Sequence, residues 1–370
     1  MIRLDNVSKT FPGAPGPAVD RVSMEVPDGE ICVLLGPSGC GKTTTMKMVN
    51  RLVEPSSGDI FIDGRNTRDV DPVQLRRSLG YVIQQIGLFP NKTIEDNICI
   101  VPDILGWERA RSRRRAAELL EMVALDPGSF LKRYPKELSG GQQQRIGVLR
   151  AIAADPPVLL MDEPFGAIDP INREIIQDEF LKIQRTVKKT IMFVSHDIDE
   201  AVKMADRIAI FRDGRLVQYD TPDHVLAHPA DTFVSDFVGG DRTLKRLQLL
   251  KVSDAMLSDP PRVRPEDALD AAARLMEEQG HKSIVVVGPR GRVRGFVALE
   301  AARGTKGKVA EHQESLPTTI RATENLRTAV STMFRHDVMW LACVDEDGAY
   351  IGYVTLRGIT QLLAGAYGDG

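Results

Sequence analysis

The sequence predicts an α/β protein whose first domain alternates strands and helices and is followed by a pair of smaller α+β modules. Short apolar runs alternate with segments of helical spacing over residues 1–238. A glycine-rich turn joins one of these apolar runs to a helical segment. The last third of the chain repeats itself in sequence. Together these three observations favour an N-terminal domain built on a sheet covered on both faces. They also favour a C-terminal domain made of two similar units.

The glycine-rich turn begins at Gly36 and fits the pattern G-x-x-x-x-G-K-[ST] of a phosphate-binding P-loop. The apolar run Ile31–Leu35 predicts a buried strand before it, and the following segment has helical spacing. Backbone N–H groups and a helix N-terminus would then face an anion. Lys42 would reach the β- and γ-phosphates, and Thr43 would offer its hydroxyl to Mg²⁺. The residues predicted to hold the phosphates are Gly36, Pro37, Ser38, Gly39, Cys40, Gly41, Lys42, Thr43 and Thr44.

Composition excludes several classes of protein. The chain has 370 residues and a formal net charge of −3, and no broad basic field points to nucleic acid. No apolar stretch approaches the ~18 residues that span a bilayer, and the N-terminus lacks the apolar core of a signal peptide. The four cysteines are scattered without metal-site or disulfide spacing. We therefore expect a cytosolic, reduced setting in which any membrane contact is made through a partner.

The elements around the P-loop follow in order. Residues 2–4 and 22–26 predict strands, and Phe11 lies between them. An exposed aromatic residue at this place would stack on an adenine ring or pack on the sheet, and the residues alone favour neither. Residues 59–64 predict a strand that closes on a D-G turn, and residues 79–83 predict another that ends at Gln84.

A helical region follows, from about residue 103 to residue 152. Residues 107–123 contain a dense arginine run that could bind anionic lipid or nucleic acid. Because aromatic interleaving is missing, we favour a solvated helix face instead. Ser139 is a candidate N-cap for the next helix, and Gly140 and Gly141 at its start form a second candidate phosphate site.

Two apolar strands then deliver polar residues at their carboxyl ends. Residues 157–161 end in the carboxylates of Asp162 and Glu163, and residues 190–195 end in His196. In an open α/β sheet this edge is where ligands bind, and adjacent carboxylates there suit metal and water chemistry.

The ordered set of motifs over residues 1–238 resembles the ATP-binding cassette (ABC) ATPases. The set comprises the P-loop, Gln84, Leu-Ser-Gly-Gly-Gln at 138–142, the strand to Asp162 and Glu163, Asp169, and His196. Residues 80–90 resemble the version found in importers of glycine betaine, carnitine and choline. The resemblance implies a P-loop ABC-type nucleotide-binding domain with a helical subdomain, which hydrolyses ATP with Mg²⁺.

The same resemblance implies a role for each matching residue. Phe11 would stack on adenine. Gln84 would sense Mg²⁺ and the attacking water, and its loop would face a membrane subunit. Asp162 would hold Mg²⁺ through water, alongside Thr43 and Gln84. Glu163 would be the general base, and His196 would contact the γ-phosphate.

The resemblance also implies a homodimer that sandwiches two ATP molecules. Ser139 and Gly141 would reach the γ-phosphate of the ATP bound to the other subunit, and Asp169 would link the two sites. We call Leu-Ser-Gly-Gly-Gln at 138–142 the signature. By this resemblance it contributes four residues to nucleotide binding, Ser139, Gly140, Gly141 and Gln142.

The C-terminal third begins with a Lys/Arg-rich stretch, which we expect to be a linker over residues 239–252. A shift of 57 residues then places Leu269 on Leu326 without a gap, and the two units should pack together. They resemble a tandem pair of CBS modules, at 253–313 and 315–370. Such pairs often bind adenosine-containing ligands through an aspartate, but Ala301 and Gly358 stand at the two positions concerned. This change argues against simple AMP or ATP and leaves a cyclic dinucleotide as a candidate.

The sequence therefore predicts the ATPase subunit of an importer for a quaternary-amine osmoprotectant. We expect integral membrane permease subunits and a substrate-binding protein as partners, no nucleic acid, and a peripheral location on the cytoplasmic face of the plasma membrane. Three alternatives remain at this stage. They are an importer ATPase for another small solute, a soluble ABC ATPase acting on ribosomes or DNA, and a nucleotide sensor without turnover. The intact Glu163 argues against the last, and the single Leu-Ser-Gly-Gly-Gln argues against the second.

Overall fold

The protein is seen here in a computed structural model that describes residues 1–83, 87–166 and 168–365. It divides into two compact units, residues 1–225 with 229–239 and residues 226–228 with 240–370. Within the described ranges, no helix is both long and apolar enough to cross a bilayer. The four cysteines are buried as free thiols.

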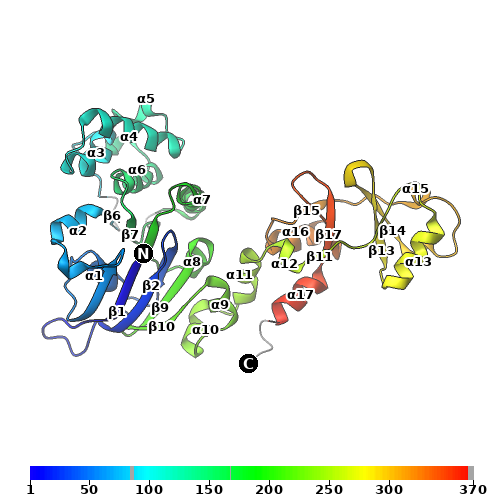
Figure 1. Cartoon of the computed structure of the whole chain (residues 1–370), viewed down its shortest axis with the longest axis horizontal. Helices are drawn as coiled ribbons and strands as arrows, with labels where there is room; N and C mark the ends of the chain where they lie inside the picture. The colour runs from blue at the N-terminus through cyan, green and yellow to red at the C-terminus, as the bar shows by residue number, and fades with distance from the viewer. Residues whose placement is uncertain (84–86, 167, 366–370) are drawn as a thin grey trace. The chain divides into compact units, whose positions relative to one another are not determined.

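A six-stranded sheet forms the centre of the first unit (Figure 1). Five of its strands run parallel, and an antiparallel edge strand completes it. Three of the parallel strands are buried along their whole length because other elements pack on both faces of the sheet, which explains their continuous apolar sequence. In spatial order the strands are β10 (Arg215–Asp220), β9 (Arg207–Arg212), β3 (Ile31–Leu35), β8 (Thr190–Val194), β7 (Val158–Asp162) and β6 (Leu79–Val82).

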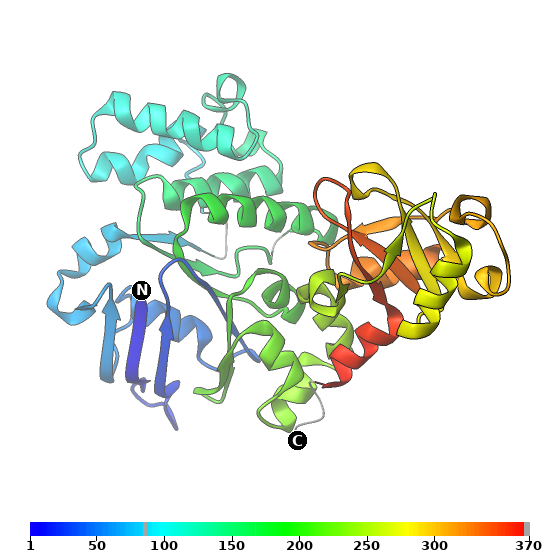
Figure 2. The same cartoon turned by 45° about the vertical axis from the view of Figure 1, so that its right-hand side comes forward.

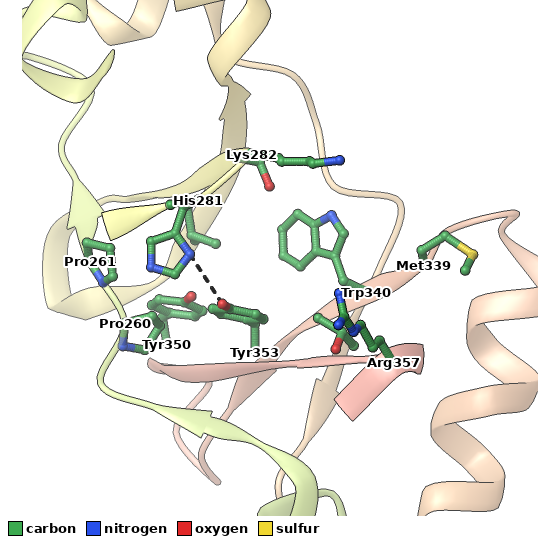
Figure 3. A pocket seen from close by; sticks show the side chains of 13 residues that line it. Pro260, Pro261, His281, Lys282, Met339, Trp340, Tyr350, Tyr353 and Arg357 are labelled. Atoms are coloured by element: carbon green, nitrogen blue, oxygen red, sulfur yellow. Dashed lines mark hydrogen bonds between the residues drawn. The ribbon is translucent and has the colours of Figure 1, made fainter. Parts of the chain in front are cut away.

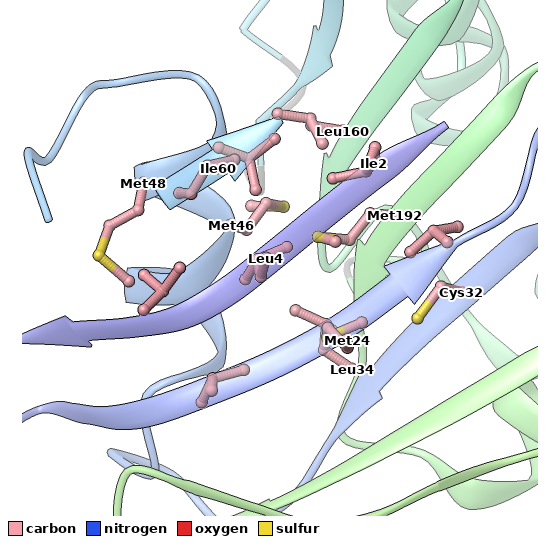
Figure 4. Packing of buried hydrophobic residues seen from close by; sticks show 14 of the residues in the cluster. Ile2, Leu4, Met24, Cys32, Leu34, Met46, Met48, Ile60, Leu160 and Met192 are labelled. Carbon is pink, nitrogen blue, oxygen red and sulfur yellow. The ribbon is translucent and has the colours of Figure 1, made fainter. Parts of the chain in front are cut away.

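An antiparallel sheet of four strands packs over the parallel one. Its order is β2 (Val19–Val26), β1 (Ile2–Lys9), β4 (Ser57–Ile62) and β5 (Arg65–Asn66). Figure 4 shows Ile2 and Leu4 of β1 directed toward Leu34, Leu160 and Met192 of the parallel sheet. The same core takes in Met46 and Met48 of the helix that follows the P-loop, so that helix is fixed against the sheets by buried side chains.

A group of helices forms a subdomain beside the sheets, in cyan and green in Figures 1 and 2. The helix that carries the arginine run buries Ser112, Ala116 and Leu119 at helical spacing and exposes Arg109 and Arg114, as a solvated face requires. The subdomain contains α3 (Ile94–Ile104), α4 (Arg109–Met122), α5 (Pro127–Phe130) and α6 (Gly140–Ile152). The other helices of the first unit are α1 (Lys42–Val49), α2 (Pro72–Ser78), α7 (Pro170–Val187), α8 (Ile198–Met204), α9 (Pro222–Ala227) and α10 (Thr232–Val238).

The basic stretch expected to be a linker over residues 239–252 contains a helix, α11 (Arg242–Leu249). Leu247 is buried in the core of the second repeat with Leu326 and Met333, and Leu250 packs beside it. These leucines form an apolar edge on an otherwise charged helix, and the abundance of Lys and Arg hides that edge in the composition.

The two repeats of the second unit fold alike. Their helices and their two longer strands begin 57 residues apart, which confirms the repeat seen in the sequence. The first repeat contains β12 (Arg262–Val263), α13 (Leu269–Gln279), β13 (Ser283–Val287), β14 (Val293–Ala298) and α14 (Leu299–Ala302). The second contains β15 (Thr319–Arg321), α16 (Leu326–Arg335), β16 (Trp340–Val344), β17 (Tyr350–Thr355) and α17 (Leu356–Gly365).

A short segment before each repeat packs on the other repeat. Before the first lie α12 (Val252–Ala255) and β11 (Leu257–Ser258), and β11 pairs with β17 of the second repeat. Before the second lies α15 (Val309–His312), and Glu314, two residues after this helix, bridges to Phe296 of the first repeat. The two repeats therefore exchange their leading segments.

Two glycines make room for this exchange. A Cβ at Gly352 would lie 2.4 Å from the carbonyl oxygen of Leu257, and a Cβ at Gly295 would lie 2.2 Å from that of Glu314. Both distances are shorter than any real Cβ contact, so the crossing chain requires glycine at these two equivalent positions.

Candidate functional site

The P-loop connects β3 to α1 and is shaped by glycines that no other residue could replace. Gly36 has φ of 140° and Gly41 has φ of 102°, both in the region that favours glycine. A Cβ at Gly36 would lie 2.2 Å from the carbonyl oxygen of Phe211, and one at Gly41 would lie 2.5 Å from that of Ala18. The loop is thus a backbone cradle at a helix N-terminus, which fits the phosphates of a nucleotide.

Lys42 lies at the start of α1 and is almost fully buried. Its ammonium group donates hydrogen bonds to the carbonyl oxygens of Gly36, at 2.7 Å, and Pro37, at 2.9 Å. The side chain therefore folds back over the loop, and its charge is placed among the groups that would surround a phosphate.

Thr43 and Asp162 meet at the carboxyl end of the parallel sheet. The Thr43 hydroxyl donates to Asp162 Oδ1 at 3.3 Å. Burial raises the pKa of the Asp162 carboxyl above its ordinary value, and the hydrogen bond from Thr43 opposes that rise. A hydroxyl and one carboxylate suit Mg²⁺, which keeps several waters and takes further oxygens from phosphate. The described residues contain no cluster of three or more His, Cys, Asp or Glu that could hold a metal alone.

Glu163 and His196 form a hydrogen-bonded pair beside the Thr43 hydroxyl and the Asp162 carboxylate. Glu163 follows β7, His196 follows β8, and the atoms Oε1 and Nε2 lie 2.6 Å apart. Glu163 has φ of 46°, an uncommon conformation for this residue type, and its N–H donates to the carbonyl oxygen of Val194. The backbone thus aims the carboxylate away from the strand and toward His196.

One buried residue that supports Glu163 was not found from the sequence. The Gln144 side chain donates a hydrogen bond to the carbonyl oxygen of Pro164, directly after Glu163. Gln144 lies on α6, the helix that begins at the signature. Its hydrogen bond therefore connects this helix to the segment that carries Glu163. Its only sequence signal is a glutamine at a buried position of an apolar helix.

The signature segment is ordered by its own capping box. Ser139 Oγ accepts from the N–H of Gln142 at 3.3 Å, and Gln142 Oε1 accepts from the N–H of Ser139 at 3.0 Å. This confirms Ser139 as the N-cap of α6. Figure 1 shows α6 in the helical subdomain, away from α1. In the part of the chain that is described, no hydrogen bond joins residues 138–142 to the P-loop.

The remaining predicted site residues lie as follows. Phe11 is 40% exposed, and the Lys9 ammonium lies 5.2 Å from its ring centroid. Asp169 precedes α7, and its carbonyl oxygen accepts from the N–H of Arg173. Gln84 falls outside the described residues, so its predicted contacts are not seen.

A loop after residue 86 exposes Phe89 to 46% and is held by two side chains, Arg150, which donates to the carbonyl oxygen of Gly87, and Asn97. Asn97 of α3 is completely buried. Its amide donates to the carbonyl oxygens of Phe89, Lys92 and Thr93, and its oxygen accepts from the N–H of Phe89. The buried amide of Asn97 thus fixes the exposed Phe89. The sequence pattern did not reveal this role of Asn97.

A backbone phosphate cradle, an acidic strand end and a carboxylate–histidine pair define a P-loop nucleotide hydrolase. A family model for ABC transporters matches residues 19–166, and a family model for CBS domains matches residues 252–302 and 315–365. The chain is thus an ABC ATPase with a CBS pair.

Similar proteins define the family more closely. The chain is 55% identical to the osmoprotectant import ATP-binding protein OsmV of Salmonella typhimurium, over 98% of this chain and 96% of that protein. It is 46% identical to the glycine betaine/carnitine/choline transport ATP-binding protein OpuCA of Bacillus subtilis, with the same coverage. The chain therefore belongs to the ATP-binding subunits of the quaternary-amine osmoprotectant importers, and it is an ATPase coupled to transport.

Solved structures match the cassette. The dimeric structure of MJ0796, a bacterial ABC transporter cassette, is 35% identical with a TM-score of 0.53, over 60% of this chain and 99% of that one. A post-hydrolysis dimer of MJ0796, bound to ADP and Pi, matches with 34% identity and the same TM-score.

Proposed function

We propose that this chain powers uptake of a quaternary-amine osmoprotectant through a separate membrane permease, working at the cytoplasmic face of the membrane. The transport roles of the relatives OsmV and OpuCA support the substrate class, because each protein aligns with nearly the whole chain. The observation that carries the hydrolytic role is the Glu163–His196 pair beside Asp162 and the P-loop.

Each residue of that site has a proposed task. Glu163 accepts the proton of the attacking water, and His196 holds the carboxylate until the γ-phosphate engages the imidazole. Thr43 and Asp162, with Gln84, hold Mg²⁺, which supplies charge neutralisation at the phosphates when bound. Lys42 exchanges its carbonyl partners for phosphate oxygens, and Phe11 stacks on the adenine.

We further propose that the hydrolytic site is completed by a second copy of the chain. Two observations support this: the signature lies away from the P-loop within one chain, and the matching cassette MJ0796 is dimeric. Ser139, Gly140, Gly141 and Gln142 then act on the partner's ATP, and Asp169 links the two sites. Mixing Lys42→Ala chains with Ser139→Arg chains should restore one intact site per dimer. Full activity in a monomer would contradict this arrangement.

Two further partners follow from importer function. The exposed Phe89, fixed by Asn97, is the proposed contact for a short helix of the permease. A substrate-binding protein would deliver the solute to the outer side of that permease.

We assign the cassette to residues 1–238, the connecting segment to 239–252, and the regulatory CBS modules to 253–313 and 315–370. Ala301 and Gly358 at the ribose-binding positions support a ligand other than AMP or ATP, such as a cyclic dinucleotide. Deleting residues 253–370 should preserve ATP hydrolysis but change how uptake responds to salt or cyclic dinucleotide. Identical response curves would leave the pair as a dimerisation element.

The decisive experiment is reconstitution of the full-length chain with its permease in proteoliposomes. ATP-dependent uptake of labelled glycine betaine is expected, and Glu163→Gln protein should give none. ATP-dependent uptake of an unrelated solute, with none of glycine betaine, carnitine or choline, would overturn the substrate class.

A further inference from the structure

A cavity of about 410 Å³ lies in the second unit, between the two repeats. Figure 3 shows His281 on one side of this space and Trp340 on the other, with Tyr353 between them at its floor. His281 lies just before β13 of the first repeat, whereas Trp340 and Tyr353 belong to β16 and β17 of the second. Both repeats therefore contribute to one site, and its volume is typical of small-molecule pockets.

The aromatic rings of the cavity stand at right angles to one another. Tyr353 makes edge-to-face contacts with His281, at 84°, and with Trp340, at 79°. A hydrogen bond of 3.3 Å between the Tyr353 hydroxyl and His281 Nδ1 fixes the first pair. Phe296 supports Trp340 from behind with a third perpendicular contact. Rings at right angles enclose a rounded group, and aromatic faces attract a cation such as a quaternary ammonium.

The charged groups of the lining all have the same sign. Lys282 and Arg357 lie at the rim, both exposed, and neither is in an ion pair with another described residue. Among the described residues that line the cavity, none carries a carboxylate. A simple cation would meet uncompensated positive charge here, whereas a ligand with a carboxylate of its own would pair with Arg357 or Lys282.

We propose that this cavity binds a zwitterion with a quaternary ammonium group at one end and a carboxylate at the other, as in glycine betaine and carnitine. The ammonium end lies among His281, Trp340 and Tyr353, and the carboxylate end reaches Arg357. The role of the site rests on the proposed function. By binding the imported solute, the cavity senses the concentration of that solute inside the cell. The same chain then both powers uptake and measures its product.

A nucleoside fits this lining less well. A flat base packs best between parallel surfaces, but the rings here are mutually perpendicular. A ribose diol is usually held by a carboxylate, which this lining lacks. The perpendicular rings and the one-sided charge both favour the zwitterion.

The first test is fluorescence titration of the full-length chain carrying Trp107→Phe, in which Trp340 is the remaining tryptophan. Glycine betaine should change its emission with a Kd on the order of 1 mM. Choline lacks the carboxylate, and 3,3-dimethylbutanoate has the shape of betaine without the positive charge. Each should bind roughly tenfold more weakly or worse. Equal binding of 3,3-dimethylbutanoate and betaine, or no response to betaine, would overturn the proposal.

The second test is equilibrium dialysis with labelled glycine betaine. Trp340→Leu and Arg357→Gln should each weaken binding by about tenfold, and Trp340→Tyr should retain part of it. Arg357 is exposed, so its replacement tests the site even if Trp340→Leu fails to fold. The control is Phe334→Leu, at a 71% exposed side chain outside the cavity, which should bind betaine normally. Displacement of betaine by AMP, ATP or cyclic di-AMP at micromolar concentration would show a nucleotide site instead.

The two proposals fail separately in these experiments. Betaine uptake by a chain that does not bind betaine overturns the sensing site alone. Betaine binding at Trp340 without uptake of any quaternary amine overturns the transport role alone.

Discussion

The P-loop and the cavity between the repeats are built from different parts of the chain. The P-loop is a run of nine consecutive residues whose backbone forms the cradle, and glycines exclude side chains from it. The cavity is lined by side chains from both repeats, and its backbone only positions them. At a site made from backbone, a substitution that adds a side chain disrupts ligand binding. At a site made from side chains, a single substitution changes the affinity only in part. The predictions below test this difference.

The largest effect is expected at the cassette. Glu163→Gln should lower the ATP turnover rate about 10²–10⁴-fold, because an amide cannot accept the proton of the attacking water. ATP binding and betaine binding should both remain, since neither uses the lost charge. Steady-state ATPase assays with nucleotide-binding controls measure the first, and dialysis measures the second. Turnover near the wild-type rate would remove Glu163 from the general-base role.

The next largest effect concerns the cradle itself. Gly36→Ala places a Cβ 2.2 Å from the carbonyl oxygen of Phe211 at φ of 140°, so the loop must rearrange. ATP affinity should fall by more than about tenfold, and thermal unfolding should move several degrees lower. Gly39→Ala is the matched control, because its φ is also positive but no atom lies within 4 Å. If both variants lost ATP affinity and thermal stability equally, the positive φ alone would explain the loss, and the clash with Phe211 would not contribute.

A smaller effect is expected in the second unit. Gly352→Ala puts a Cβ 2.4 Å from the Leu257 carbonyl oxygen and should cost about 1–3 kcal/mol of stability by overpacking. Basal ATP hydrolysis should be unchanged, because the cassette is a separate compact unit. Denaturant unfolding followed at Trp340 measures the loss. Gly240→Ala, which has open space, should unfold like the wild type.

The smallest effect on the stability of the cassette is expected at Phe89, in the loop proposed to contact the permease. Phe89→Asp changes a side chain that is 46% exposed, so stability should shift by less than about 0.5 kcal/mol. Basal ATPase should persist while reconstituted uptake is lost. A drop of several degrees in the unfolding temperature with loss of ATP binding would instead make Phe89 a core residue.

The same contrast explains what could be predicted from the sequence. Strands β3, β7 and β8 were predicted almost to the residue, because strands buried on both faces are written as continuous apolar runs. The cap at Ser139 was predicted because its signal is local. Asn97 and Gln144 were missed, because a buried amide is recognised only by the distant carbonyls it meets. The aromatic cavity was missed for the same reason, since His281 and Trp340 lie in different repeats.

The exchange of leading segments between the repeats has a consequence for how such a pair arose. Val252 donates its N–H to the carbonyl oxygen of Glu324, and Val309 donates its own to that of Asp267, so each repeat completes the other in the same way. A single ancestral module with this architecture would have exchanged its leading segment with a second copy, as domain-swapped dimers do. Gene duplication then joined the two copies into one chain. Once fused, the halves were free to diverge, and the equivalent positions 283 and 340 now carry Ser283 and Trp340, which both line the same cavity.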